Sequence, residues 1–447
     1  MLRQYRFALT GWLVGVTCHA ICPSWATANA PAIRLAPVVR KLLDDPATDA
    51  SRRRHLAIFH GQWDQISDLT PAERARIALG KYQLHDESLQ NGLAAPHASA
   101  VAALRRGDPQ RVLDLLDLIK EPKTARTAVL RAQALDMTGN RSEALTTLLP
   151  WREKLERESF DDAEQLTAAA RGLVMLAAYE GRPAHDYHTA MRFFAKAHSE
   201  LDRLYWPAHL AEAELLVAKH NSKEAASALS LALELNPHSS RAWYLLGLIG
   251  LKQFDFAQAI ACEQRLRQIN PRHLLADLLQ VQIRLTQADP QTAAVALTPA
   301  LTAHPKHRLL IALKAATDAL RYNEADLKAT ISRFESLWPG GAMVYHTVGT
   351  YLTMARQYDS AAQMFRLAIE RDPNWPDPRS ELGLILLQAG REQEAQKELA
   401  VAVDLDPFHT RAANSMKLVK HLLAYEQIAT KHFVIKYHKG IDQVLAR

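Results

Sequence analysis

The sequence has little glycine, little cysteine and few tyrosines. Its 447 residues include 17 glycines, 3 cysteines and 12 tyrosines. This scarcity argues against an all-β protein, because strands and their turns draw on aromatic residues and glycine. Abundant alanine and leucine favour helices instead. The length corresponds to two to four domains, or to one long array of repeats.

Cysteine is too scarce for a disulfide framework. Cys18 and Cys22 lie among the first 30 residues, and Cys262 lies in a stretch with a helical pattern. If the N-terminal segment is removed, a single thiol remains and no internal disulfide can form. We interpret Cys262 as a small buried hydrophobic residue.

Long apolar runs are also missing, apart from a stretch of moderate length at the N-terminus. Residues 7–22 follow Arg3 and Arg6 and precede the small-residue stretch ATANA, which ends at Ala30. This pattern is typical of a secretory signal peptide that is cleaved after Ala30. The alternatives are an uncleaved anchor and a lipoprotein signal ending at Cys18. We therefore expect an exported protein, periplasmic or secreted, with no stable membrane span after cleavage.

Positively and negatively charged residues are nearly equal in number. The net charge is +6, and the only compact basic run is Arg52–Arg54. We interpret this run as a solvated helix start, so no nucleic-acid partner is expected.

Motifs that carry chemistry are missing from the sequence. It has no His-Glu-x-x-His helix, no glycine-rich phosphate loop, no Gly-x-Ser-x-Gly elbow and no Cys-x-x-Cys pair. We interpret the closely spaced His185 and His188 as part of a solvated turn. The expectation is a non-enzymatic chain with no cofactor and no metal.

One strong pattern is present, a period of 34 residues. Prolines recur at this interval, at Pro237, Pro271, Pro305, Pro339, Pro373 and Pro407. Twelve residues before each proline stand Ala225, Ala259, Ala293, Leu327, Ala361 and Ala395. Each period has room for two helices and two tight turns, and small residues allow the helices to approach closely. Since one helix pair leaves an apolar face exposed, we expect the pairs to stack.

These residues resemble tetratricopeptide repeats, in six regular units over residues 206–407. The resemblance implies an all-α, right-handed superhelical solenoid of helix-turn-helix pairs. We interpret residues 1–30 as the signal peptide and 31–205 as degenerate repeats of the same kind. Residues 408–431 are expected to form a capping helix.

The resemblance implies that the first helix of each pair lines a concave groove for a protein or peptide ligand. By register, the expected groove residues are Arg241, Tyr244, Leu248 and Lys252 in one unit, and Met343, His346, Thr350 and Met354 in another. The alternative is that Tyr244 and Met354 only pack against the next helix. Some family members clamp a ligand carboxylate with a lysine and an asparagine, and neither unit has that pair. A chaperone tail is therefore not the expected ligand.

The last residues have a different period. In residues 432–447, Phe433, Ile435 and Tyr437 alternate with other residues, which predicts a short β-strand. This tail resembles the start of a peptidase-MA-like (gluzincin) domain. We therefore expect an exported scaffold that binds protein or peptide partners in its groove. The alternative is the N-terminal recruiting arm of an exported zinc metallopeptidase whose catalytic domain lies beyond residue 447.

Overall fold

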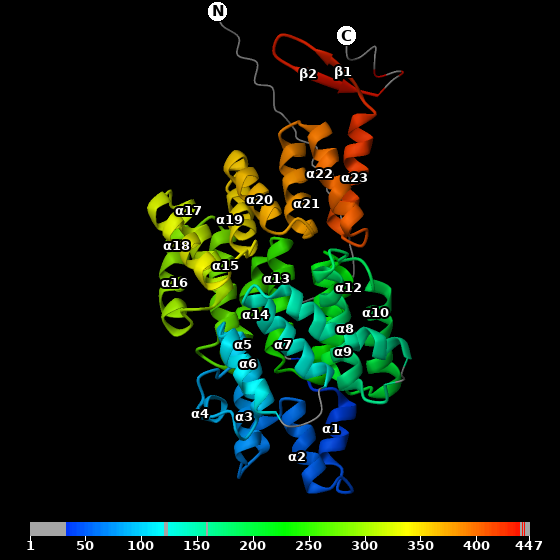
Figure 1. The fold of residues 1–447 in the computed structure, drawn as a ribbon, viewed down its shortest axis with the longest axis vertical. Coiled ribbons are helices and arrows are strands. Elements are labelled where there is room, and N and C mark those ends of the chain that lie inside the picture. Colours follow the sequence, from blue (N-terminus) through cyan, green and yellow to red (C-terminus); the bar gives the residue numbers. More distant parts are fainter. Residues whose placement is uncertain (1–32, 120–123, 158–159, 439, 441, 443–447) are drawn as a thin grey trace, which may run out of the picture.

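The computed structural model describes residues 33–119, 124–157, 160–438, 440 and 442. The predicted signal peptide lies outside these residues. No helix in the described ranges combines the length and apolar character needed to cross a membrane. The described chain is an all-α solenoid that ends in a β-hairpin, and the predicted fold class is confirmed (Figure 1).

The N-terminal half contains helices of uneven length. They are α1 (Pro37–Asp44), α2 (Ala50–Phe59), α3 (Pro71–Gly80), α4 (Glu87–Gln90), α5 (Pro96–Arg106), α6 (Pro109–Asp117), α7 (Ala125–Met137), α8 (Arg141–Arg157), α9 (Ala163–Tyr179) and α10 (Tyr187–Lys196). A 3₁₀ turn, η1 (Trp63–Gln65), follows α2, and a π-helical turn, η2 (Ala197–Leu201), extends α10.

The second half consists of regular pairs. They are α11 (Trp206–Ala218) with α12 (Ser222–Leu235), α13 (Ser240–Lys252) with α14 (Phe256–Ile269), α15 (Leu274–Thr286) with α16 (Pro290–Ala303), α17 (Arg308–Leu320) with α18 (Glu324–Leu337), α19 (Met343–Met354) with α20 (Tyr358–Arg371), and α21 (Pro376–Gln388) with α22 (Glu392–Leu405). Helix α23 (Thr410–Leu423) follows them. The second helix of each pair ends two residues before the periodic proline, which has no N–H with which to continue the helix.

The cores of these pairs are built on small residues. Ala225, Ala259 and Ala361 are fully buried, as the spacing predicts. Cys262 is also buried, and burial raises the pKa of its thiol to about 12. The prediction that Cys262 is buried is confirmed.

The turn inside each pair contains one residue in the left-handed region. These residues also recur every 34 positions, at His220, Phe254, Ala288, Tyr322, Arg356 and Gly390, with φ between 56° and 72°. Only the last is glycine, the residue that adopts this conformation without steric cost. The other five turns are therefore held in shape by the packing of the helices that they join.

We expect Ala288→Gly to stabilise the protein by about 0.5–1 kcal/mol, because Ala288 is exposed and has a φ of 58°. The matched control is Ala400→Gly at an exposed position inside α22, where the same change should destabilise by about 1 kcal/mol. Chemical denaturation of both variants measures the two effects. If both substitutions lower the free energy of unfolding, the turn at Ala288 is not strained.

Successive turns of the superhelix pack on one another. The turns inside the earlier helix pairs meet the proline-containing turns of later pairs. His60 Nδ1 lies 2.9 Å from the carbonyl oxygen of Leu235, and Asn270 Nδ2 donates to the carbonyl of Tyr82 at 3.2 Å. A Cβ at Gly107 would overlap the backbone carbonyl of Lys306, so the backbones of these two turns are in close contact. In Figure 1 the orange helices α21–α23 accordingly stand over the green α10–α12.

A buried ion pair joins the same two layers at their C-terminal contact. Lys219 Nζ, at the end of α11, lies 2.6 Å from Asp406 Oδ2, and the two side chains are 6% and 2% exposed. The backbone N–H of Thr410 also donates to the carbonyl of Lys219. This contact fixes the last repeats against the first regular one.

The predicted C-terminal strand finds its partner within the described chain. Strand β2 (Val434–Tyr437) pairs antiparallel with β1 (Glu426–Ala429), with Glu426 opposite Tyr437 and Ala429 opposite Val434. The expected capping helix over 408–431 is therefore too long, since α23 ends at Leu423. The correction has a physical reason: an isolated strand leaves its backbone groups unpaired, and β1 supplies the partner.

Candidate functional site

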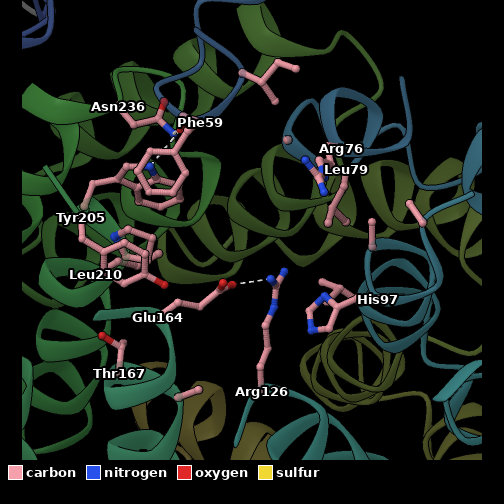
Figure 2. Close-up of a pocket in the computed structure, with 18 of the residues that line it drawn as sticks. Phe59, Arg76, Leu79, His97, Arg126, Glu164, Thr167, Tyr205, Leu210 and Asn236 are labelled. Atoms are coloured by element: carbon pink, nitrogen blue, oxygen red, sulfur yellow. Dashed lines mark hydrogen bonds and ion pairs between the residues drawn. The ribbon is translucent and has the colours of Figure 1, made fainter. Parts of the chain in front are cut away.

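A large cavity lies between the helices of the N-terminal half and the first helices of the second half. Its volume is about 1380 Å³. The first helices α3, α5, α7, α9, α11 and α13 contribute to its wall, together with α2. Figure 2 shows side chains from these elements pointing into the cavity from opposite sides.

The wall of the cavity carries more positive than negative side chains. The arginines are Arg52, Arg76, Arg105, Arg126, Arg171 and Arg241, and the carboxylates are Asp162, Glu164 and Asp202. Aromatic residues stand among them, including Phe59, Trp63, Tyr82, Tyr205 and Trp206. A wall of arginine and aromatic side chains has the composition found at the centres of protein interfaces.

Arg126 is at the centre of this wall. Its guanidinium donates to Glu164 across the cavity, while His97 lies on its other side (Figure 2). Burial lowers the pKa of Arg126, Glu164 raises it, and the positive charge of Arg76 lowers it again. Burial, helped by the charge of Arg126, lowers the pKa of His97 to about 3, so this imidazole is neutral at pH 7. Glu164 thus pairs with Arg126, and Arg76 adds a second positive charge near Arg126, which leaves positive charge for an anionic ligand.

A second arginine pair shares a single carboxylate. Arg171 Nη2 lies 2.7 Å from Glu214 Oε2, and Arg241 Nε lies 2.9 Å from Glu214 Oε1. Burial alone would raise the pKa of Glu214, but the two arginines outweigh it and lower the pKa. This network ties α9, α11 and α13 together.

The predicted groove residues of α13 have different surroundings. Arg241 lines the cavity, but its guanidinium is held by Glu214. Tyr244 is 2% exposed, and its hydroxyl donates to Gln282 Oε1 at 2.9 Å. Leu248 is partly buried and Lys252 is exposed at the end of the helix.

The predicted groove residues of α19 also differ from one another in exposure and contacts. Met343 is partly buried and Met354 is exposed. The ring of His346 packs 4.5 Å from that of Trp375, and Thr350 Oγ1 donates to the carbonyl of His346. Burial lowers the pKa of His346 to about 4, and the charge of Lys252 contributes to this shift. The fold thus brings Lys252 and His346 from the two units within electrostatic range of each other.

Sequence reasoning missed the residues at the centre of the cavity. Arg76, His97, Arg126 and Glu164 belong to the irregular repeats, where the spacing between units varies and gives no register. A signal that could have found them is the presence of an arginine in several successive first helices of that half. Only the three-dimensional winding brings those helices around one cavity.

Comparisons with known proteins agree with the repeat pattern. Models of the tetratricopeptide-repeat family match residues 210–273 and 352–418. The presence of tetratricopeptide repeats is thereby confirmed. A search of curated protein sequences gives no match.

Several solved structures have a similar fold at low sequence identity. The Cut9–Hcn1 hetero-tetramer of the APC/C is 16% identical, with 84% of this chain and 63% of that chain covered and a TM-score of 0.43. A tetratricopeptide repeat protein from Parabacteroides merdae is 15% identical, with coverages of 59% and 98% and a TM-score of 0.39. Yeast Tom70 is 15% identical, with coverages of 78% and 87% and a TM-score of 0.38.

Proposed function

We propose, from the premise that this chain is a tetratricopeptide-repeat scaffold suited to protein–protein interaction, that it is exported and binds an acidic, extended segment of a partner protein. The segment would lie in the cavity lined by α2, α3, α5, α7, α9, α11 and α13. The observation that carries the proposal is the excess of arginines over carboxylates in that cavity, where Arg76 lies close enough to lower the pKa of Arg126.

The size and lining of the cavity favour a protein segment over a small molecule. Pockets for small molecules usually enclose about 300–1000 Å³, and this cavity measures about 1380 Å³. Arginines give bidentate hydrogen bonds to carboxylates, and the aromatic residues beside them provide apolar contact. An extended segment with aspartate or glutamate and apolar side chains matches both features.

Binding of a fluorescent acidic peptide tests the proposal. The peptide should have about ten residues, an extended length of about 33 Å. We expect the Arg76→Glu variant to lose at least about tenfold in affinity, because one attractive contact becomes repulsive. The side chain of Arg76 is exposed and makes no hydrogen bond among the described residues, so this substitution should leave the fold intact.

The matched control is Arg366→Glu, a change of an exposed arginine on α20 outside the cavity. Its affinity should equal that of the wild type, and an amide version of the peptide should bind weakly to both. Equal losses for the two variants would assign the effect to overall charge and contradict binding in the cavity.

The proposal of export rests on Arg3, Arg6, the apolar run and the ATANA stretch. We expect the chain produced in a bacterial host to be recovered outside the cytoplasm with Pro31 as its first residue. Intact-mass measurement distinguishes this product from the full-length chain. Retention of residues 1–30 in a membrane fraction would support the anchor instead.

A second candidate function, the recruiting arm of a zinc metallopeptidase, is favoured by the C-terminal hairpin. Phe433 and Val434 on this hairpin are 73% and 61% exposed. Two strands alone form a marginal sheet, and exposed apolar residues on it are suited to packing against further structure. The DNA downstream of the Arg447 codon tests this candidate: an open frame with a His-Glu-x-x-His helix supports it, and a stop codon refutes it.

A further inference from the structure

Two clusters of histidine and carboxylate side chains lie outside the cavity, within the described residues. One consists of His198, His209 and Glu212, and the other of His220, Asp377 and His409. In each cluster one ligand atom per residue lies within 4.8 Å of the others. The hydrogen bonds of the imidazole rings decide which of the two clusters can bind a metal ion.

The cluster around Asp377 is a hydrogen-bond network. His409 Nδ1 accepts from the backbone N–H of Ala412 at 3.1 Å, so the ring proton must be on Nε2. That nitrogen faces Asp377 Oδ1 at 3.5 Å, while the other oxygen of Asp377 accepts from Trp375 Nε1. A metal at His409 Nε2 would move the proton to Nδ1 and oppose the cap of α23. This cluster therefore joins two turns of the superhelix and is a poor metal site.

The cluster around His209 has no such conflict. His209 and Glu212 are three residues apart on α11, so their side chains lie on one face. His198 comes from the π-helical turn η2, and its Nε2 lies 3.2 Å from Glu212 Oε2. Turns of this kind occur mostly as single-turn bulges in α-helices and are frequent at functional sites.

His209 itself has an unsatisfied nitrogen. The residue is 8% exposed, and its Nδ1 is buried without a hydrogen bond among the described residues. A buried polar atom without a partner costs free energy.

We propose that His198, His209 and Glu212 form a zinc-binding site that ties η2 to α11. Two imidazoles and one carboxylate are a common set of three protein ligands for Zn²⁺, with water in the fourth position. His198 and Glu212 are 18% and 22% exposed, which gives the ion a route of entry. No metal was expected from the sequence, because these residues belong to no spaced motif.

Binding requires a local rearrangement. The two imidazole rings are stacked with centroids 3.9 Å apart and 24° between their planes. A metal ion lies in the plane of each imidazole that binds it, so one ring must rotate. His198 is the more exposed of the two and rotates about its side-chain bonds. Its contact with Glu212 is then replaced by coordination of both groups to the ion.

Titration of the full chain with Zn²⁺ in a buffer that does not coordinate metals tests the site. We expect one saturable Zn²⁺ per chain and a rise in the melting temperature. Each of His198→Ala, His209→Gln and Glu212→Gln should weaken binding at least about tenfold and abolish the rise in melting temperature. Co²⁺ in place of Zn²⁺ should give the intense visible absorption of a four-coordinate site, and the variants should lack it.

The control is Asp377→Asn, which alters the other cluster and should bind Zn²⁺ as the wild type does. Glu212 is partly exposed, so its variant keeps the test valid if the buried His209→Gln variant does not fold. The proposal is overturned if the wild type shows no saturable binding. It is equally overturned if Glu212→Gln binds Zn²⁺ with unchanged affinity, or if only Asp377→Asn loses the ion.

Discussion

Acidification from pH 7.5 to pH 5.5 is expected to lower the free energy of unfolding by about 3 kcal/mol. Three histidines carry this expectation: His209, His273 and His304 are 8%, 0% and 6% exposed. Burial is the largest cause in each case and lowers their pKa values to about 4, about 3 and about 4. Each would contribute about 1 kcal/mol at pH 5.5.

The sign follows from proton binding in the two states. The unfolded imidazoles titrate near pH 6.5, whereas the folded ones titrate near pH 3–4. Between these values only the unfolded chain binds the protons, so acid favours unfolding. The stabilisation is complete above the unfolded pKa and is lost as the pH falls towards the folded pKa. His97, His307 and His346 have pKa values lowered in the same direction and add to the effect.

Denaturant unfolding over this pH range measures the effect, and one substitution isolates it. His273 Nδ1 accepts from the backbone N–H of Leu275 at the start of α15, and asparagine can serve as an N-cap without titrating. His273→Asn should therefore reduce the loss between pH 7.5 and 5.5 by about 1 kcal/mol. His432→Asn changes an exposed histidine and should leave the loss unchanged. A pH dependence that is equal in the two variants would contradict the assignment to His273.

Removal of the Lys219 ammonium is expected to destabilise the protein by about 3–5 kcal/mol. In Lys219→Met the carboxylate of Asp406, 2% exposed, would remain buried without its counter-charge. Lys219 Nζ also donates to the carbonyl of Pro183, so the substitution removes two contacts of one group. The effect is large because the protein interior replaces water that would otherwise solvate the anion.

The control is Arg391→Met, which breaks an ion pair with Glu394 whose side chains are 47% and 50% exposed. That change should cost less than about 1 kcal/mol, as is usual for exposed pairs. The double variant Lys219→Met/Asp406→Asn removes the buried charge and should recover part of the loss. Denaturant midpoints of the four proteins measure these differences, and similar losses for the two single variants would refute the importance of burial.

The sequence predicts the regular repeats well because each residue that recurs with the period has a structural role. A proline every 34 residues follows the second helix of each pair, and in five of the six units the residue twelve positions before it is a buried alanine. The strand over Val434–Tyr437 is also visible from its two-residue alternation. Its partner was missed because Glu426–Ala429 has no strand pattern of its own and adopts that form through pairing.

The cavity and the contacts between turns could not be predicted from the sequence. His60 and Leu235 are 175 residues apart, and Lys219 and Asp406 are 187 residues apart. Such pairs depend on how many helix pairs complete one turn of the superhelix, which accumulates from small rotations at every repeat. For the same reason the groove residues assigned by register, such as Tyr244, include side chains that the winding buries.

The stacked turns also affect the order in which the chain can mature. Most solenoids acquire stability locally, because each repeat touches only its neighbours. Here the edge formed by residues near 60, 82, 107 and 219 receives its partners from residues near 235, 270, 306 and 406. Part of the surface of the first repeats therefore stays exposed after synthesis, until the segments that cover it have been made. The second half supplies the contacts that the first half lacks. We therefore expect the array to fold as one cooperative unit only after its last repeats have been synthesised.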